Sequence, residues 1–168
     1  MNIALLVALA LLFAVEGGAS PPMVSVLVPE TVKLVAGEFI EVQISVTITE
    51  GYHLQANPAS EDYLVPTRLE LKSSGDVTVS NITYPPGKPY RLNGADKDLQ
   101  TYEGNFEIGV LVKASSVARS GKRILQGRLH YQACDSKTCL FPTSVPLALT
   151  VRVVPSHRKA PQASGAKQ

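Results

Sequence analysis

The most constraining feature of this sequence is the alternation of apolar and polar residues in FIEVQISVTITE, residues 39–50. β-branched apolar residues occupy every second position, and the positions between them are mostly polar. The apolar set is Ile40, Val42, Ile44, Val46 and Ile48. Because successive side chains of a strand point to opposite faces, this period of two predicts a strand with one buried face and one solvated face.

Shorter stretches with the same period recur along the chain, separated by Pro- and Gly-containing turn signals such as PPG at 85–87 and NG at 93–94. They cover residues 23–28, 31–35, 67–72, 76–84, 105–114, 123–134 and 145–154. No segment carries a long helical period. Seven or eight short strands predict an all-β fold, and we expect an immunoglobulin-like antiparallel β-sandwich, although periodicity alone does not separate sandwiches from barrels.

The two ends of the chain differ from its strand-rich middle. Residues 1–19 contain the apolar run 3–15, followed by small residues up to Ala19, which is the pattern of a cleaved export signal. The run is shorter than the roughly 20 residues that a membrane span needs, which favours a cleaved signal. No Lys or Arg precedes the run, however, and a signal usually has such a charge, so an uncleaved anchor is the alternative. We therefore expect a signal over 1–19, one domain over 20–154 and a small, polar, disordered tail over 155–168.

Charge and motifs exclude several classes of function. The formal net charge is +2 and charged residues make up 18% of the chain, which does not indicate a nucleic-acid partner. There is no Ser-His-Asp signature and no phosphate-binding glycine loop, so we expect no small-molecule cofactor. His53, which follows Gly51 and Tyr52, is interpreted as a packing residue at a strand end.

The chain has two cysteines, Cys134 and Cys139, both within YQACDSKTCLFP at residues 131–142. If Ser136 and Lys137 form a two-residue turn, the cysteines face each other with Cα atoms about 4.5 Å apart. This separation is at the short end of disulfide reach. A protein exported to the periplasm or secreted can keep such a bond, but the spacing permits the bond without requiring it.

The alternation in residues 123–134 also predicts which way Cys134 points. One face carries the apolar residues Leu125, Leu129, Tyr131 and Ala133, and the other carries Gln126, Arg128, His130, Gln132 and Cys134. We therefore expect Cys134 to point outward from the sandwich, at the end of its strand.

Three interpretations of the pair remain open from the residues alone. A structural staple would contribute only about 2 kcal/mol, because the closed loop is small. A metal site needs further ligands, and His130 on the same strand lies about 13 Å from Cys134. A redox pair would depend on its thiolate, which Lys137 favours and Asp135 opposes.

The hairpin sequence HYQACDSKTCLFPTSVPLALTV resembles the N-terminal periplasmic domain of DsbD, the thiol:disulfide interchange protein. That family has Tyr-Gln-(Ala/Gly)-Cys, a short loop, Cys, an apolar or aromatic residue and Pro. The matching residues are Tyr131, Gln132, Cys134, Cys139 and Pro142. EGYHLQA, YPPGKP and TYEGNFEIGVLVKA resemble further family segments, so the similarity runs from about Val24 to Val154.

The resemblance implies a thiol–disulfide oxidoreductase of the protein-disulfide reductase type, with Cys134 and Cys139 as its redox pair. Gln132, Asp135 and Lys137 would adjoin that pair. Such a domain takes electrons from a membrane donor and passes them to thioredoxin-fold partners. We expect the donor to be encoded elsewhere, since no membrane domain follows in this chain.

The resemblance also implies a loop that caps the disulfide with an aromatic side chain. By position, Tyr102 in LQTYEGNF matches the cap, and the capping loop would be residues 91–104. We assign Cys134 as the cysteine that forms the mixed disulfide, because it ends a strand near this cap. The competing interpretation is a non-catalytic protein-binding sandwich with a structural disulfide.

Overall fold

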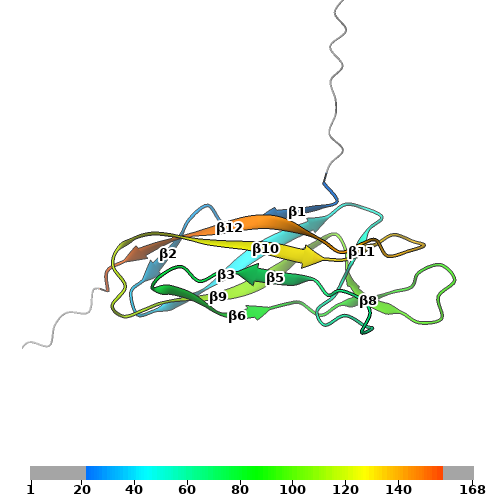
Figure 1. Cartoon of the computed structure of the whole chain (residues 1–168), viewed down its shortest axis with the longest axis horizontal. Coiled ribbons are helices and arrows are strands. Elements are labelled where there is room, and N and C mark those ends of the chain that lie inside the picture. Colours follow the sequence, from blue (N-terminus) through cyan, green and yellow to red (C-terminus); the bar gives the residue numbers. More distant parts are fainter. Residues whose placement is uncertain (1–21, 157–168) are drawn as a thin grey trace, which may run out of the picture.

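The computed structural model describes residues 22–156, which form short and long β-strands (Figure 1). The signal expected over residues 1–19 lies outside the described residues, as does most of the expected tail. The strands are β1 (Val24–Leu27), β2 (Val32–Val35), β3 (Phe39–Ile48), β4 (His53–Gln55), β5 (Arg68–Leu71), β6 (Val77–Thr83), β7 (Lys88–Tyr90), β8 (Leu99–Tyr102), β9 (Asn105–Ala114), β10 (Gly121–Tyr131), β11 (Ala133–Cys134) and β12 (Thr143–Val154).

Two four-stranded sheets form the body of the molecule. One has the order β1-β3-β9-β6 and the other β2-β12-β10-β5. Their pairs are antiparallel except for β2 and β12, which run parallel. The predicted all-β fold with mainly antiparallel pairing is confirmed, and all eight predicted stretches contain a strand.

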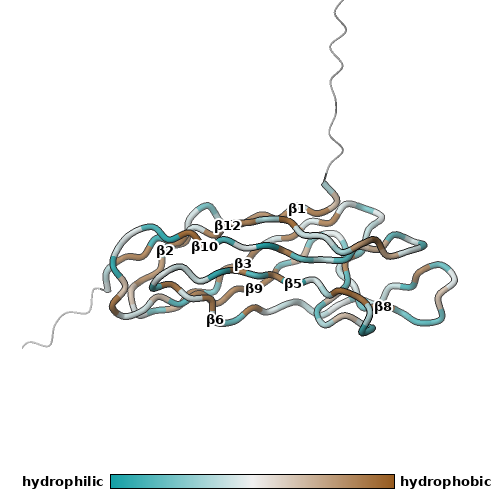
Figure 2. Tube along the Cα trace, viewed as in Figure 1, coloured by the Kyte–Doolittle hydropathy of each residue, from teal (hydrophilic) through white to brown (hydrophobic). Residues whose placement is uncertain are grey.

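The alternating pattern in β3 places its apolar side chains in the core as predicted. Val42, Ile44, Val46 and Ile48 are each at most 4% exposed, whereas Ile40 is only half-buried at the end of the sandwich. Burying each such side chain contributes about 1.5–3 kcal/mol. Figure 2 shows brown, apolar segments along the central strands and many teal, polar segments in the loops at the ends.

A third, smaller sheet was not predicted from the sequence. It has the order β11-β4-β8-β7 and lies at one end of the sandwich, on the right in Figure 1. Its strands are only two to four residues long, too short to show a period of two. Within residues 22–156, no helix has the length and hydropathy to cross a bilayer.

Candidate functional site

The cysteine hairpin has the predicted turn. Cys134 and Cys139 form a disulfide, with their Cα atoms 3.9 Å apart. The backbone N–H of Asp135 donates to the carbonyl oxygen of Thr138 across 3.0 Å, which leaves Ser136 and Lys137 as the two turn residues. The two-residue turn, which the sequence allowed but did not require, is the one that forms, and it places the two cysteines opposite each other.

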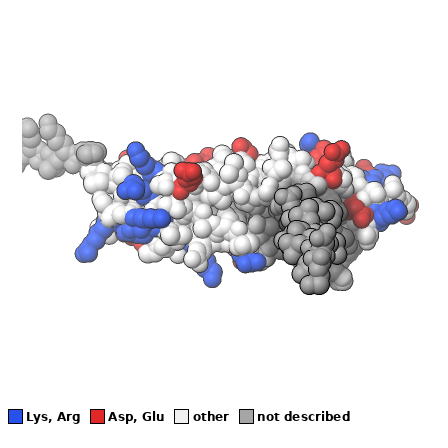
Figure 3. Space-filling model, turned by 90° about the horizontal axis from the view of Figure 1, so that it is seen from above, with Lys and Arg blue, Asp and Glu red and all other residues white. Residues whose placement is uncertain are grey.

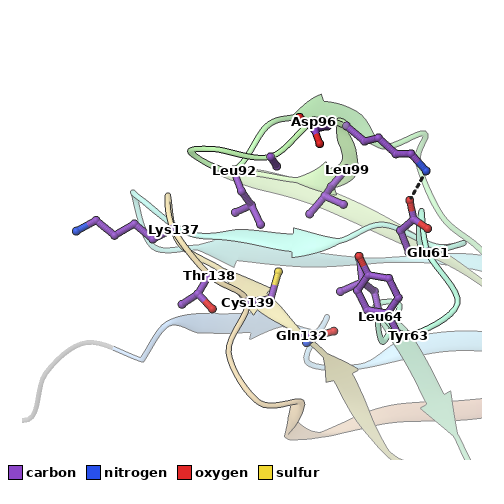
Figure 4. A pocket seen from close by; sticks show the side chains of 12 residues that line it. Glu61, Tyr63, Leu64, Leu92, Asp96, Leu99, Gln132, Lys137, Thr138 and Cys139 are labelled. Atoms are coloured by element: carbon purple, nitrogen blue, oxygen red, sulfur yellow. Dashed lines mark ion pairs between the residues drawn. The ribbon is translucent and has the colours of Figure 1, made fainter.

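Asp135 stabilises the turn rather than contacting the sulfurs. Its Oδ1 accepts hydrogen bonds from the backbone N–H groups of Lys137 (2.7 Å) and Thr138 (2.8 Å). The hydrogen bond from the backbone N–H of Lys137, followed by that from Thr138, holds the pKa of the Asp135 carboxyl below its usual value. The Lys137 side chain is exposed and points away from Cys139 in Figure 4, so the structure shows no direct contact of Lys137 with the sulfur.

Gln132 joins the hairpin to the loop that precedes β5. Its Oε1 accepts from the backbone N–H of Val65 (2.8 Å), and its Nε2 donates to the carbonyl oxygen of Leu140 (3.1 Å). Both bonds are to backbone groups. Gln132 thus positions the segment that carries Cys139.

The expectation that Cys134 is exposed is wrong, because its side chain has an exposed fraction of 0%. The register pairs Cys134 with His53 and Ala133 with Leu54, and paired residues share a face of the sheet. Cys134 therefore points to the face opposite Ala133, as the alternation predicted. That face is covered, however, because Leu64 and Leu99 pack on Cys134 as a second apolar cluster.

Gln55 lies on the same face, and its place beside the disulfide was not predicted from the sequence. Its Nε2 donates to Cys134 Sγ across 3.0 Å and lies 3.7 Å from Cys139 Sγ. Gln55 is itself fully buried. The segment EGYHLQA had been singled out by its resemblance, but nothing in it identified this residue as a neighbour of the disulfide.

His53 packs beside the pair, as expected of a strand-end residue. Its ring stacks on Tyr90 with centroids 3.5 Å apart, and its Nε2 lies 3.4 Å from Glu103 Oε2. The Tyr90 hydroxyl in turn donates to the carbonyl oxygen of Asp135 across 3.4 Å. Strand β7 therefore reaches the hairpin through an aromatic side chain.

The structure does not bring Tyr102 to the disulfide, which corrects the expected cap. Tyr102 pairs with Leu54 and so faces the main core, on the side of the small sheet opposite Cys134. Its hydroxyl accepts from Asn57 N and donates to Pro85 O, each at 3.0 Å, and its ring stacks on Phe106. Burial raises the pKa of this phenol. Successive residues of a strand point to opposite faces, so Thr101, the neighbour of Tyr102 in β8, points to the face that carries the disulfide, and Tyr102 points to the other face.

Part of the expected capping loop does cover the pair, but with leucines. Leu92 and Leu99, at the two ends of the β7–β8 connection, pack with Leu64 over the disulfide. The backbone N–H of Asn93 donates to the carbonyl oxygen of Ser136 across 2.9 Å. This bond holds the loop against the tip of the cysteine hairpin.

Cys139 opens onto a surface pocket, whereas Cys134 does not line it. Figure 4 shows the Cys139 sulfur between Leu92 and Leu99 on one side and Gln132 on the other. The pocket is further lined by Glu61, Tyr63, Leu64, Ala95, Asp96, Lys97, Lys137 and Thr138. Acidic and basic side chains both occur at this end of the molecule, while Lys and Arg gather at the other end in the view of Figure 3.

No group of three or more His, Cys, Asp or Glu side chains within residues 22–156 is arranged to hold a metal ion.

Among solved structures, the N-terminal periplasmic domain of ScsB from Proteus mirabilis is similar, with a TM-score of 0.52 and 16% identity. The match covers 75% of this chain and 44% of that chain, so the chain spans less than half of its relative's length. A type I cohesin of ScaB from Pseudobacteroides cellulosolvens is also similar, with a TM-score of 0.45 and 9% identity, and the match covers 86% of this chain and 98% of that chain. A PapD-like domain of human CEP192 has a TM-score of 0.44 and 9% identity, and the match covers 89% of this chain and 99% of that chain. At these identities the likeness concerns the fold alone. Comparison with curated protein sequences gives no match.

The sequence of this chain also matches the model of a protein family. The N-terminal domain of the thiol:disulfide interchange protein DsbD matches over residues 24–150, which is most of the chain. This range contains the disulfide hairpin and the residues that contact it. The chain therefore belongs to the family of the DsbD N-terminal domain.

Proposed function

We propose that this domain is a thiol–disulfide exchange module that relays two electrons through the Cys134–Cys139 pair. The observation that carries the proposal is the asymmetry of the two sulfurs. Cys139 is half-buried and lines a pocket, whereas Cys134 is fully buried behind it. A disulfide with one accessible sulfur offers a single point of attack to a thiol of a partner protein.

In the reducing half of the relay, a thiolate of the electron donor attacks Cys139 Sγ in line with the S–S bond. A bond forms between the donor sulfur and Cys139 Sγ, and the bond to Cys134 Sγ breaks. The electron pair of the broken bond remains on Cys134 as a thiolate. A second thiolate of the donor then attacks the donor sulfur of the mixed disulfide, which releases an oxidised donor and the Cys139 thiolate.

In the oxidising half, the Cys139 thiolate attacks a disulfide of the acceptor and forms a second mixed disulfide. Cys134 then attacks Cys139 Sγ, which restores the internal bond and releases the acceptor as a dithiol. This order makes Cys139 the partner-linked cysteine. It reverses the assignment of Cys134 made from the sequence, which was based on the position of Cys134 at a strand end near the expected cap, because Cys134 is buried and Cys139 lines the pocket.

We infer that the acceptors are thioredoxin-fold proteins and that the electron donor is membrane-bound. We place the exchange in the periplasm or in another oxidising compartment outside the cytosol. The family membership supports this inference. The exposed aromatic side chains of Tyr63 (79% exposed) and Phe141 (94% exposed) flank the Cys139 segment and are available to a partner. Exposed aromatics are frequent anchors in protein interfaces.

Trapping experiments test the order of attack. The Cys134→Ser variant should accumulate a mixed disulfide with a thioredoxin-fold protein that has lost its resolving cysteine. The Cys139→Ser variant should not, because its remaining sulfur is buried. Accumulation only in Cys139→Ser would contradict the proposed order.

A structural disulfide in a binding domain is the second candidate function, and the reduction potential separates the two. Equilibration with glutathione buffers should give a potential of roughly −120 to −270 mV for a relay. A structural bond should lie below about −300 mV. A value in the lower range, without exchange with any thioredoxin-fold protein, would favour the binding domain.

A further inference from the structure

Gln55 is a buried polar side chain in contact with both sulfurs of the disulfide. Its Nε2 lies 3.0 Å from Cys134 Sγ and 3.7 Å from Cys139 Sγ. A disulfide sulfur has lone pairs but no proton, so the amide nitrogen, which donates, is the atom that faces it. The shorter contact is to Cys134, the sulfur that receives the electron pair when Cys139 is attacked.

The backbone of Gln55 is fixed on both sides. Its N–H donates to the carbonyl oxygen of Gln132 across 3.0 Å. Its carbonyl oxygen accepts from the N–H of Thr67 (3.0 Å) and from Thr67 Oγ1 (2.7 Å). Because these bonds hold the residue from neighbouring segments, the side chain is positioned before any partner arrives.

The surroundings of this contact exclude water. Cys134 and Gln55 are both fully buried, and Leu64 and Leu99 are each 8% exposed. In such a medium of low dielectric constant a hydrogen bond is electrostatically stronger than in water. A charge that develops on Cys134 is therefore poorly solvated unless a nearby donor compensates for the missing water.

We propose that Gln55 is a catalytic residue of this exchange reaction: it donates a hydrogen bond to Cys134 Sγ and stabilises the thiolate formed there when the disulfide breaks. The inference rests on the proposed function. A hydrogen bond to an ionised acceptor is roughly twice as strong as one to a neutral acceptor, so the contact strengthens as the bond to Cys139 breaks. It consequently stabilises the reduced form and raises the reduction potential.

The oxygen of the same amide group supports this role. Gln55 Oε1 is buried and has no hydrogen-bond partner within the described part of the chain. Buried polar atoms are nearly always paired, so an unpaired acceptor beside a disulfide requires an explanation. In the reduced protein the cysteine that keeps its proton is an S–H donor, and rotation of the amide can present Oε1 to it. The same amide group can therefore donate a hydrogen bond through Nε2 to a thiolate and accept one through Oε1 from a thiol.

The first experiment compares Gln55→Met with Thr101→Val in equilibrium with glutathione. Methionine keeps the length of the side chain and removes the donor, whereas Thr101 is a buried polar residue that pairs with Gln55 and has no hydrogen bond to a sulfur. We expect Gln55→Met to lower the equilibrium constant for reduction roughly tenfold, which corresponds to about 30 mV. Thr101→Val should leave the equilibrium constant within twofold.

The second experiment titrates the Cys134 thiol in the Cys139→Ser background by the ultraviolet absorbance of the thiolate. Gln55→Met should raise the pKa of this thiol, and Gln55→Glu should raise it further, because an ionised carboxylate repels the thiolate. Apart from the carboxyl that Gln55→Glu introduces, the neighbouring titratable groups are the same in every variant. They are His53, Tyr90, Glu103, Asp135 and Lys137.

The outcomes separate this inference from the proposed function. If the wild type exchanges with thiols but Gln55→Met has the same potential and the same Cys134 pKa, the role of Gln55 is wrong and the relay stands. If the wild type does not exchange, the relay itself is wrong. Should the variants not fold, the side-chain amide resonance of Gln55 in the wild type decides: it must shift on reduction and titrate with the thiol, and an unchanged resonance would overturn the proposal.

Discussion

Asn93 donates its backbone N–H to the carbonyl oxygen of Ser136 across 2.9 Å, and this bond joins the loop over the disulfide to the turn between the two cysteines. The loop around Asn93 is itself a turn, in which Ala95 N donates to Leu92 O and Gly94 has a φ of 82°. Glycine at the third position is typical of a type II turn, in which proline is favoured at the second position.

We therefore expect Asn93→Pro to remove the bond to Ser136 without breaking the turn. A net loss of one backbone hydrogen bond should make the loop open more often, and reduction of the disulfide by dithiothreitol should become roughly 2- to 10-fold faster. Asn93→Ala is the matched control, because it removes the side chain and keeps the N–H. Equal rates in the two variants would show that this bond does not hold the cover closed.

Tyr102→Phe should destabilise the protein without changing the reactivity of its disulfide. The substitution removes the acceptor for Asn57 N and the donor for Pro85 O, which costs about 1–3 kcal/mol for a buried group left unpaired. Urea unfolding measures this loss, and Tyr63→Phe at an exposed position should change stability by less than about 0.5 kcal/mol. Unchanged stability in Tyr102→Phe would contradict the structural role of these two hydrogen bonds.

Asp135 makes the turn sensitive to acid. The hydrogen bonds from Lys137 N and Thr138 N lower the pKa of its carboxyl in the folded state relative to about 3.9 in the unfolded chain. A lowered folded-state pKa gives a stabilisation that is present above the unfolded value and is lost as the pH falls through the folded value. Asp135→Asn keeps an acceptor oxygen, so its unfolding free energy should depend less steeply on pH below about pH 4 than that of the wild type. Identical slopes in the two proteins would contradict this role.

Gly127→Ala should weaken the edge of the β2-β12-β10-β5 sheet. A Cβ atom at this position would contact the carbonyl oxygen of Glu70 and would lie 2.8 Å from Leu71 Cδ2, so strand β5 would have to shift. Overpacking of this kind costs about 1–3 kcal/mol. Thermal unfolding should show the loss, whereas Gln126→Ala at the exposed neighbouring position should have little effect.

The sequence predicted the sandwich because its long strands carry their own signal. In residues 39–48 the alternation determines which side chains point inward, and a period of two persists over ten residues in β3 and β9. The closeness of the two cysteines was also expected from the sequence, since a spacing of five residues between two strands brings them together in a short turn. Both are local properties, encoded in neighbouring residues.

The tertiary structure alone decided how the disulfide is covered and contacted. The alternation correctly gave the direction in which Cys134 points, but Leu64 from the loop before β5 and Leu99 from strand β8 pack on it and bury it. Gln55 reaches Cys134 across 79 positions of the sequence, through strands too short to show a pattern. The physical reason is that local alternation fixes the orientation of a side chain, whereas its burial and its hydrogen-bond partners depend on which other segments pack against that face.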